Sequence, residues 1–123
     1  MKICVTSIKD TIDSEVDPRF GRCKYFLIID MDSNNVKTIS NESIMSAGGA
    51  GIQAAQMVAK TGASIVITGN IGPNAYKTLL AAGIKVITGV NGSIKDIIDK
   101  YTKGELNETE APNVGSHHGI GGR

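Results

Sequence analysis

The residues best suited to hold a metal in this chain are two cysteines and two histidines. Cys23 follows Arg19-Phe20-Gly21-Arg22 and precedes Lys24, so the neighbouring cations are expected to favour its thiolate. His117 and His118 stand side by side near the C-terminus. Thiolate and imidazole are ligands for iron, copper and zinc, which makes Cys23 and this histidine pair candidate ligands for a metal or a metal cluster.

Each of these residues also has a plainer interpretation. A free cysteine is often only a small buried apolar residue, which is the interpretation we prefer for Cys4. For Cys23 the two interpretations remain open. A histidine pair in a glycine-rich segment is more often idle than a ligand. The two cysteines lack the C-x-x-C spacing of a structural zinc site.

A glycine-rich stretch, Gly49-Ala50-Gly51-Ile52-Gln53-Ala54, has the G-x-G-x-x-A spacing of a dinucleotide-binding loop. That motif requires a strand directly before it and an acidic residue about 20 positions later. The chain has no Asp or Glu between Ser43 and Lys95, and residues 41–47 separate the motif from the preceding strand. The stretch is therefore better explained as a helix N-terminus that favours some other anion.

No catalytic constellation is expected. The first predicted strand, residues 2–7, carries no carboxylate to hold the catalytic metals of a nuclease. Neither histidine occurs in a nucleophile motif such as G-x-S-x-G, and no general base is positioned by the sequence. We therefore expect a protein that is not an enzyme.

Hydrophobic patterning predicts the elements that must position these residues. Strands are expected at residues 2–7, 24–31, 36–40, 64–68 and 84–88. Helices are expected after Gly51, from Pro73 to Gly83, and from Ser93 to Gly104. The order β-β-β-α-β-α-β-α predicts an α/β fold with a mixed five-stranded sheet flanked by helices, an architecture that resembles ribonuclease H.

The predicted strand directions bring several segments to one edge of the sheet. If only the second strand runs backwards, the carboxyl ends of the other four strands share that edge, where open α/β sheets bind ligands. The loop 8–23, the glycine-rich stretch and Gly89–Gly92 would then face one crevice. The candidate binding residues are Arg19, Arg22, Gly49, Ala50, Gly51 and Asn70.

The length and the net charge of the chain constrain the class of protein. With 123 residues and a net charge of +1, we expect one domain over residues 1–103 and a flexible tail over 104–123 that contains glycine and histidine. A net charge this small gives no overall electrostatic attraction to nucleic acid, and no apolar run is long enough to span a bilayer. We expect a cytoplasmic protein that is a monomer or a weak oligomer.

Four stretches together resemble the dinitrogenase iron–molybdenum cofactor biosynthesis family: VDPRFGRCKYF at 16–26, GGAGIQAA at 48–55, TGNIGPNA at 68–75 and AGIKV at 82–86. The resemblance implies a ribonuclease H-like fold and a carrier of iron–sulfur or iron–molybdenum clusters. It also implies cluster-donor or cluster-acceptor proteins as partners. The C-terminal SHHGIGGR is similar to a short version of the tail found in small members of that family.

Three functions remain in view. The first is a non-catalytic carrier of an anionic metallocluster, with Cys23, His117 and His118 as candidate ligands. The second is a metal-free regulatory module that binds a small anion or a nucleotide. The third is a protein-interaction domain whose glycines serve only packing.

Overall fold

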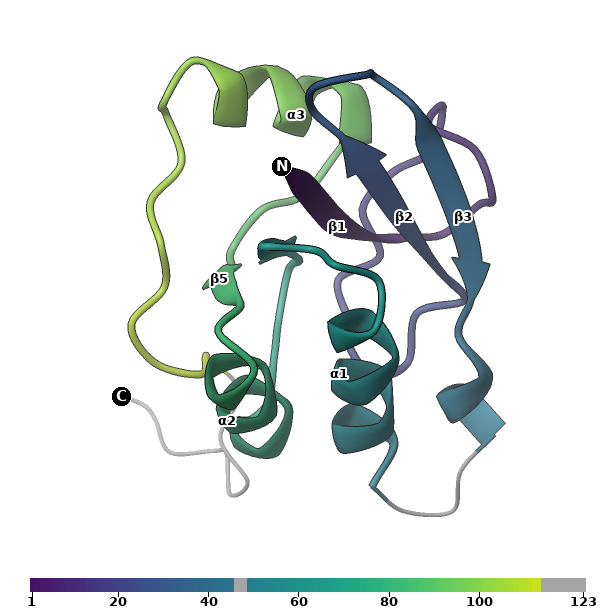
Figure 1. Cartoon of the computed structure of the whole chain (residues 1–123), viewed down its shortest axis with the longest axis vertical. Coiled ribbons are helices and arrows are strands. Elements are labelled where there is room, and N and C mark those ends of the chain that lie inside the picture. Colours follow the sequence, from purple (N-terminus) through teal and green to yellow (C-terminus); the bar gives the residue numbers. More distant parts are fainter. Residues whose placement is uncertain (46–48, 114–123) are drawn as a thin grey trace.

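The computed structural model describes residues 1–45 and 49–113, which form a five-stranded sheet covered by helices (Figure 1). The strands are β1 (Lys2–Ser7), β2 (Tyr25–Asp30), β3 (Val36–Ser40), β4 (Ile65–Ile67) and β5 (Lys85–Ile87). The helices are α1 (Ala50–Ala59), α2 (Pro73–Ala81) and α3 (Ile94–Thr102), with a short 3-10 turn, η1, at Glu42–Met45. The element order is the predicted one, with η1 added.

The strands lie in the order β3-β2-β1-β4-β5. β1 pairs antiparallel with β2 and parallel with β4, β2 pairs antiparallel with β3, and β4 pairs parallel with β5. Only β2 therefore runs against the other strands, as the sequence predicted. The mixed five-stranded α/β sheet is confirmed, and its classification as ribonuclease H-like stays a prediction.

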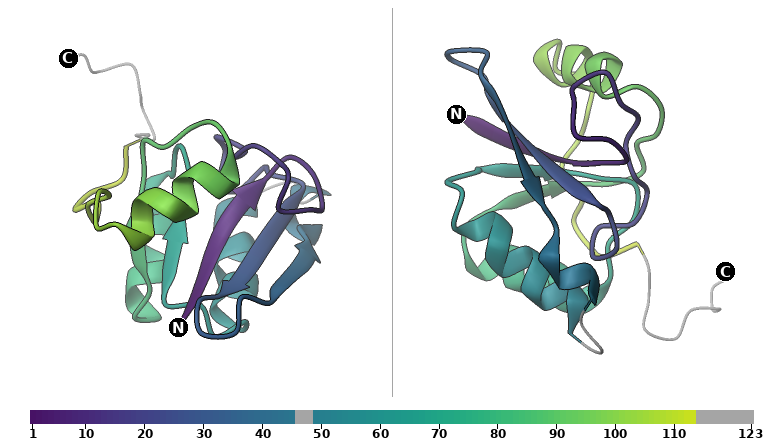
Figure 2. Two further views of the ribbon diagram at one scale, coloured as in Figure 1. Left: turned by 90° about the horizontal axis from the view of Figure 1, so that it is seen from above. Right: turned by 90° about the vertical axis from the view of Figure 1, so that its right-hand side faces the viewer.

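The helices divide between the two faces of the sheet, as the side view in Figure 2 shows for α1 and α3. α1 and α2 bury Ala54, Val58 and Leu79 in one apolar cluster with Phe26 and Val66 of the sheet. α3 packs on the opposite face, in a second cluster. The division follows from alternation along buried strands, whose successive side chains point to opposite faces.

The segment after α3 returns along the exposed edge of β5. The N–H of Thr109 donates to the carbonyl of Val86 at 2.7 Å, and its hydroxyl accepts from the N–H of Thr88 at 2.8 Å. The Tyr76 hydroxyl donates to the Thr109 carbonyl at 3.1 Å. The sequence predicts a flexible tail from residue 104, whereas these bonds hold residues 105–113 against the body. Figure 1 shows this segment descending beside β5 toward α2.

None of the helices in the described ranges 1–45 and 49–113 has both the length and the apolar character needed to cross a membrane.

Candidate functional site

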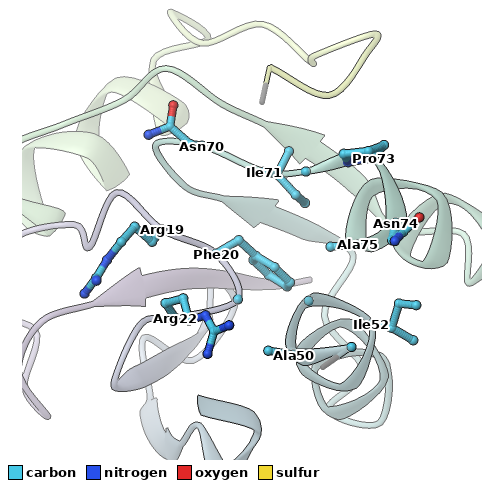
Figure 3. Close-up of a pocket in the computed structure, with 14 residues that line it drawn as sticks. Arg19, Phe20, Arg22, Ala50, Ile52, Asn70, Ile71, Pro73, Asn74 and Ala75 are labelled. Atoms are coloured by element: carbon cyan, nitrogen blue, oxygen red, sulfur yellow. The ribbon is translucent and has the colours of Figure 1, made fainter. Parts of the chain in front are cut away.

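A cavity of about 450 Å³ opens where the loop after β1 meets the first turns of α1 and α2. This volume lies within the range of small-ligand sites, about 300–1,000 Å³. Its lining comes from three segments of the chain, residues 19–22, 49–52 and 70–75. In Figure 3 the Phe20 ring lies at the middle, with Arg19 and Arg22 on one side and Ile71, Pro73 and Ala75 on the other.

The loop that carries the arginines is fixed to the loop after β4 by main-chain hydrogen bonds. The N–H of Asn70 donates to the Pro18 carbonyl at 2.7 Å, and the N–H of Phe20 donates to the Asn70 carbonyl at 3.1 Å. A side chain at Gly69 would place its Cβ 2.8 Å from the Pro18 Cα. The two loops therefore approach too closely for any residue except glycine at that position.

The other walls of the pocket are the N-terminal turns of two helices. The first N–H groups of a helix have no partner within it. In α1 these include Ala50, Gly51 and Ile52, because the N–H of Gln53 makes the first bond back to Gly49. In α2, where proline at the first position has no N–H, they belong to Asn74 and Ala75.

The N-cap residues are Gly49 in α1 and Gly72 in α2. Because glycine has no side chain, neither N-cap residue accepts a hydrogen bond from the first N–H groups of its helix. The N-cap Gly49 has a φ of 71°, a left-handed conformation that glycine adopts without strain. Neither helix has an acidic residue in its first turn. Within residues 1–45 and 49–113, the positive ends of these two helices therefore lie beside the pocket with no acidic side chain in their own first turns.

Packing brings these ends together. A Cβ on Gly21 would meet the Gly51 Cα at 3.1 Å, and a Cβ on Gly51 would meet the Ala75 Cβ at 3.3 Å. The first turn of α1 thus lies between the arginine loop and α2. Some of the glycines in this region serve packing directly, and the packing is what assembles the pocket.

Among the described residues, the charged side chains that line the pocket are Arg19 and Arg22, and none is Asp or Glu. The side chain of Arg19 is 65% exposed, and Figure 3 shows its guanidinium extending outward at the rim. Its Nε lies 3.4 Å from Oδ1 of the buried Asp17, which also accepts the Arg19 N–H at 3.0 Å. The arrangement suits an anion.

Cys23 lies away from the pocket lining, fully buried in the apolar cluster of α1 and α2. Its thiol donates to the Phe20 carbonyl at 3.3 Å. Burial, and then the nearby Asp17 carboxylate, raise the pKa of the Cys23 thiol to about 12. The expectation that neighbouring cations favour a thiolate is therefore wrong, because desolvation outweighs the Arg19 charge. A ligand role for Cys23 stays a prediction.

The other metal-ligand candidates do not form a site in the described body. Cys4 is buried, and burial raises the pKa of its thiol well above the ordinary value. Across residues 1–45 and 49–113, no group of three or more His, Cys, Asp or Glu side chains is arranged to hold a metal ion. His117 and His118 lie outside the described residues.

All six predicted binding residues, Arg19, Arg22, Gly49, Ala50, Gly51 and Asn70, line one pocket. The predicted contribution of Gly89–Gly92 is wrong, because this loop leads to α3 on the other face of the sheet. There the Gly92 carbonyl accepts from the N–H of Val16 at 2.9 Å.

Sequence reasoning missed the apolar lining, of which Phe20, Ile52 and Ile71 are the main members. Apolar side chains carry no chemical signal in a sequence.

The fold defines the class as a small α/β domain, and its pocket lies at the carboxyl ends of β1 and β4, where open α/β sheets bind ligands. Residues 1–104 match the family described as dinitrogenase iron-molybdenum cofactor. The chain belongs to this family.

Individual relatives extend over nearly the same length. The structure is similar to the apo form of the orange protein from Desulfovibrio gigas, with a TM-score of 0.89 and 37% identity over 91% of this chain and 95% of that one. A Thermotoga protein solved by NMR gives a TM-score of 0.76 and 36% identity, covering 87% of this chain and 91% of that one. An uncharacterized protein from Methanocaldococcus jannaschii is 31% identical, over 89% of this chain and 97% of that one.

Proposed function

We propose that this protein is a non-catalytic carrier of an anionic metallocluster, of the iron–sulfur or iron–molybdenum type. The observation that carries the proposal is the pocket itself, whose described lining residues include the first turns of two helices and two arginines but no Asp or Glu. Main-chain N–H groups and guanidinium groups together stabilise negative charge without forming covalent bonds to it.

The donor groups indicate how such a cluster would be held. The described residues offer no set of metal-binding side chains, so they do not fit a cluster bound through protein–metal bonds. They fit a cluster that arrives with its own sulfides and is held by charge and hydrogen bonds. Phe20, Ile52 and Ile71 add apolar lining, against which polarizable sulfur packs favourably.

The family supports this choice of ligand. Its description names the iron–molybdenum cofactor of dinitrogenase, and the orange protein was solved in an apo form, a description that implies a form with a bound group. Cluster-donor and cluster-acceptor proteins are the partners that a carrier requires. A cytoplasmic location and a monomeric or weakly oligomeric state stay predictions.

A metal-free module for a small anion or a nucleotide is the second candidate. The same amides and arginines would bind a phosphate group. The absence of acidic residues from 43 to 95 leaves no partner for a ribose, which favours a plain anion over a dinucleotide.

Anaerobic titration tests both functions. The protein is mixed with isolated iron–molybdenum cofactor, with an iron–sulfur cluster donor, or with inorganic phosphate. Metal retained after desalting is measured together with the amide shifts of Ala50 and Ala75. Retained metal with shifts at these amides supports the carrier. Shifts with phosphate alone favour the anion module, and no shift with any of the three refutes both.

A matched pair of double variants separates the pocket from the overall charge. Arg19→Gln/Arg22→Gln is expected to weaken cluster binding on the order of tenfold, because exposed ion pairs contribute up to about 1 kcal/mol each. Lys37→Gln/Lys100→Gln removes the same charge from β3 and α3 and is expected to leave binding within about twofold of wild type by the same reasoning. Equal losses in the two variants would show that binding depends on net charge alone.

A further inference from the structure

Asn113, the last residue that the structure describes, lies beside the pocket loop that joins β4 to α2. Its side-chain Oδ1 accepts a hydrogen bond from the N–H of Ile71 at 2.8 Å. Its Nδ2 donates to the Gly69 carbonyl at 3.0 Å and to Oδ1 of Asn70 at 3.1 Å. One amide side chain therefore contacts three consecutive residues, two of which line the pocket.

Asn113 completes the main-chain hydrogen bonding of the loop that joins β4 to α2. The N–H and the carbonyl of Asn70 both form hydrogen bonds with the loop that carries the arginines. The Gly69 carbonyl also accepts from the N–H of Gly89 at 2.8 Å. Ile71 is 1% exposed, and the acceptor for its N–H is Asn113. A buried N–H that loses its partner is destabilising, so Asn113 holds the chain where it approaches α2.

The same contacts determine which end of the Asn70 amide is hydrogen-bonded and which end is not. Because the Ile71 N–H requires an acceptor, the oxygen of Asn113 must face it. The Asn113 NH₂ group then faces Gly69 and Asn70, and it requires an oxygen from Asn70. The Asn70 oxygen is thereby occupied, and its NH₂ group is left as the end without a partner among residues 1–45 and 49–113.

From this geometry we propose that Asn113 is a positioning residue of the anion site. It acts through Asn70 and the loop before α2, and it makes that loop present N–H donors to an anion. The inference rests on the proposed function for its ligand. It also extends the site beyond the predicted domain boundary at residue 103, because the segment 105–113 brings Asn113 to the pocket.

Two substitutions in the full chain separate the two halves of this role. Asn113→Asp keeps an acceptor for the Ile71 N–H but loses the donor to the Gly69 carbonyl and to Asn70, so the Asn70 amide turns its NH₂ group toward the new carboxylate. Asn113→Ala loses all three contacts. Asn107 is exposed on the same segment, and Asn107→Asp and Asn107→Ala are the matched controls for charge and for truncation.

NMR of ¹⁵N-labelled protein gives the readouts. In Asn113→Ala, hydrogen exchange at the Ile71 N–H is expected to accelerate about tenfold, in line with the loss of one hydrogen bond. In Asn113→Asp that N–H stays protected, while the side-chain NH₂ signals of Asn70 move. Inorganic phosphate, titrated as the probe anion, is expected to bind Asn113→Asp about two- to tenfold more weakly than Asn107→Asp.

Unchanged Ile71 exchange in Asn113→Ala, or equal phosphate affinity in Asn113→Asp and Asn107→Asp, would overturn the proposal. Phosphate that shifts no amide even in wild type counts against the anion site itself. In that event the exchange of Ile71 and the Asn70 signals still decide whether Asn113 positions the loop, because neither needs a ligand.

Discussion

Because the thiol of Cys23 is buried, the free energy of unfolding is expected to fall as the pH rises above about 8.5. In the unfolded chain a cysteine has a pKa of about 8.5, whereas burial raises the pKa of Cys23 to about 12 in the folded protein. Between these values the unfolded state releases a proton that the folded state retains. The stabilisation is complete below about pH 8.5 and is lost as pH rises toward 12, by about 1.4 kcal/mol per pH unit. By pH 10 the loss from this residue reaches about 2 kcal/mol.

Cys23→Ser isolates this contribution. The serine hydroxyl can donate to the Phe20 carbonyl as the thiol does, but it does not titrate in this range. The free energy of unfolding is measured by urea denaturation with reductant present, at fixed ionic strength, from pH 7 to 10.5. Relative to Cys23→Ser, wild type is expected to lose about 1.4 kcal/mol more per pH unit above pH 9.

Val58→Ala is the control, because it removes buried apolar volume from the same cluster without changing a titrating group. It should lower the stability by a similar amount at every pH. Parallel pH profiles for wild type and Cys23→Ser would refute the reasoning.

The result also bears on metal binding, since a thiol with a pKa of about 12 is ionised in about one molecule in 10⁵ at pH 7. Coordination by Cys23 would then require the core to open.

Three further substitutions test the pocket, and a fourth, Gly83→Ala, is a control away from it. Gly69→Ala forces a Cβ to within 2.8 Å of the Pro18 Cα and is expected to destabilise the protein by about 1–3 kcal/mol and to weaken anion binding. A Cβ at Gly83 meets no atom within 4 Å, but the residue has a φ of 79°. Gly83→Ala should therefore lower the free energy of unfolding by about 1 kcal/mol, measured by thermal denaturation, and leave anion binding unchanged. A similar loss of binding in both variants would mean that global stability controls it. Gly49→Ala also meets no atom and should cost about 1 kcal/mol for its φ of 71°, with a shift of the α1 amides in NMR spectra. Arg19→Gln is expected to weaken phosphate or cluster binding about two- to fivefold and to reduce its salt dependence, measured by titration at two ionic strengths.

Much of the fold could be predicted because local signals agree with tertiary structure. β1 and β3 have the predicted bounds, Lys2–Ser7 and Val36–Ser40. α2 begins at the proline that suits a first helical turn, and α3 begins after Ser93, the predicted start, whose hydroxyl accepts from the Asp96 N–H. Strand direction followed from the short connection between β2 and β3, which favours an antiparallel pair, and from the two β-α units, whose parallel crossovers allow few topologies.

What escaped prediction depends on contacts between distant segments. Residues 105–113 have no periodicity, and the partners of Thr109 lie in distant segments, at the edge of β5, at Thr88 and at Tyr76 of α2. The charged neighbours of Cys23 in the sequence predicted that its thiolate would be favoured. In the fold, the environment of the thiol is set by the core side chains around it rather than by its neighbours in the chain. Both misses are tertiary effects that a local pattern does not record.

The pocket is built largely from main-chain N–H groups at the starts of α1 and α2, and this has a consequence for mutational scanning and for sequence divergence. No side-chain substitution except one to proline deletes a main-chain N–H, so alanine scanning would understate the importance of Ala50, Gly51 and Ala75. An amide-to-ester replacement at Gly51 would remove such a donor without changing the side chain. Relatives could therefore differ widely in the side chains around this pocket and still retain the same binding groups.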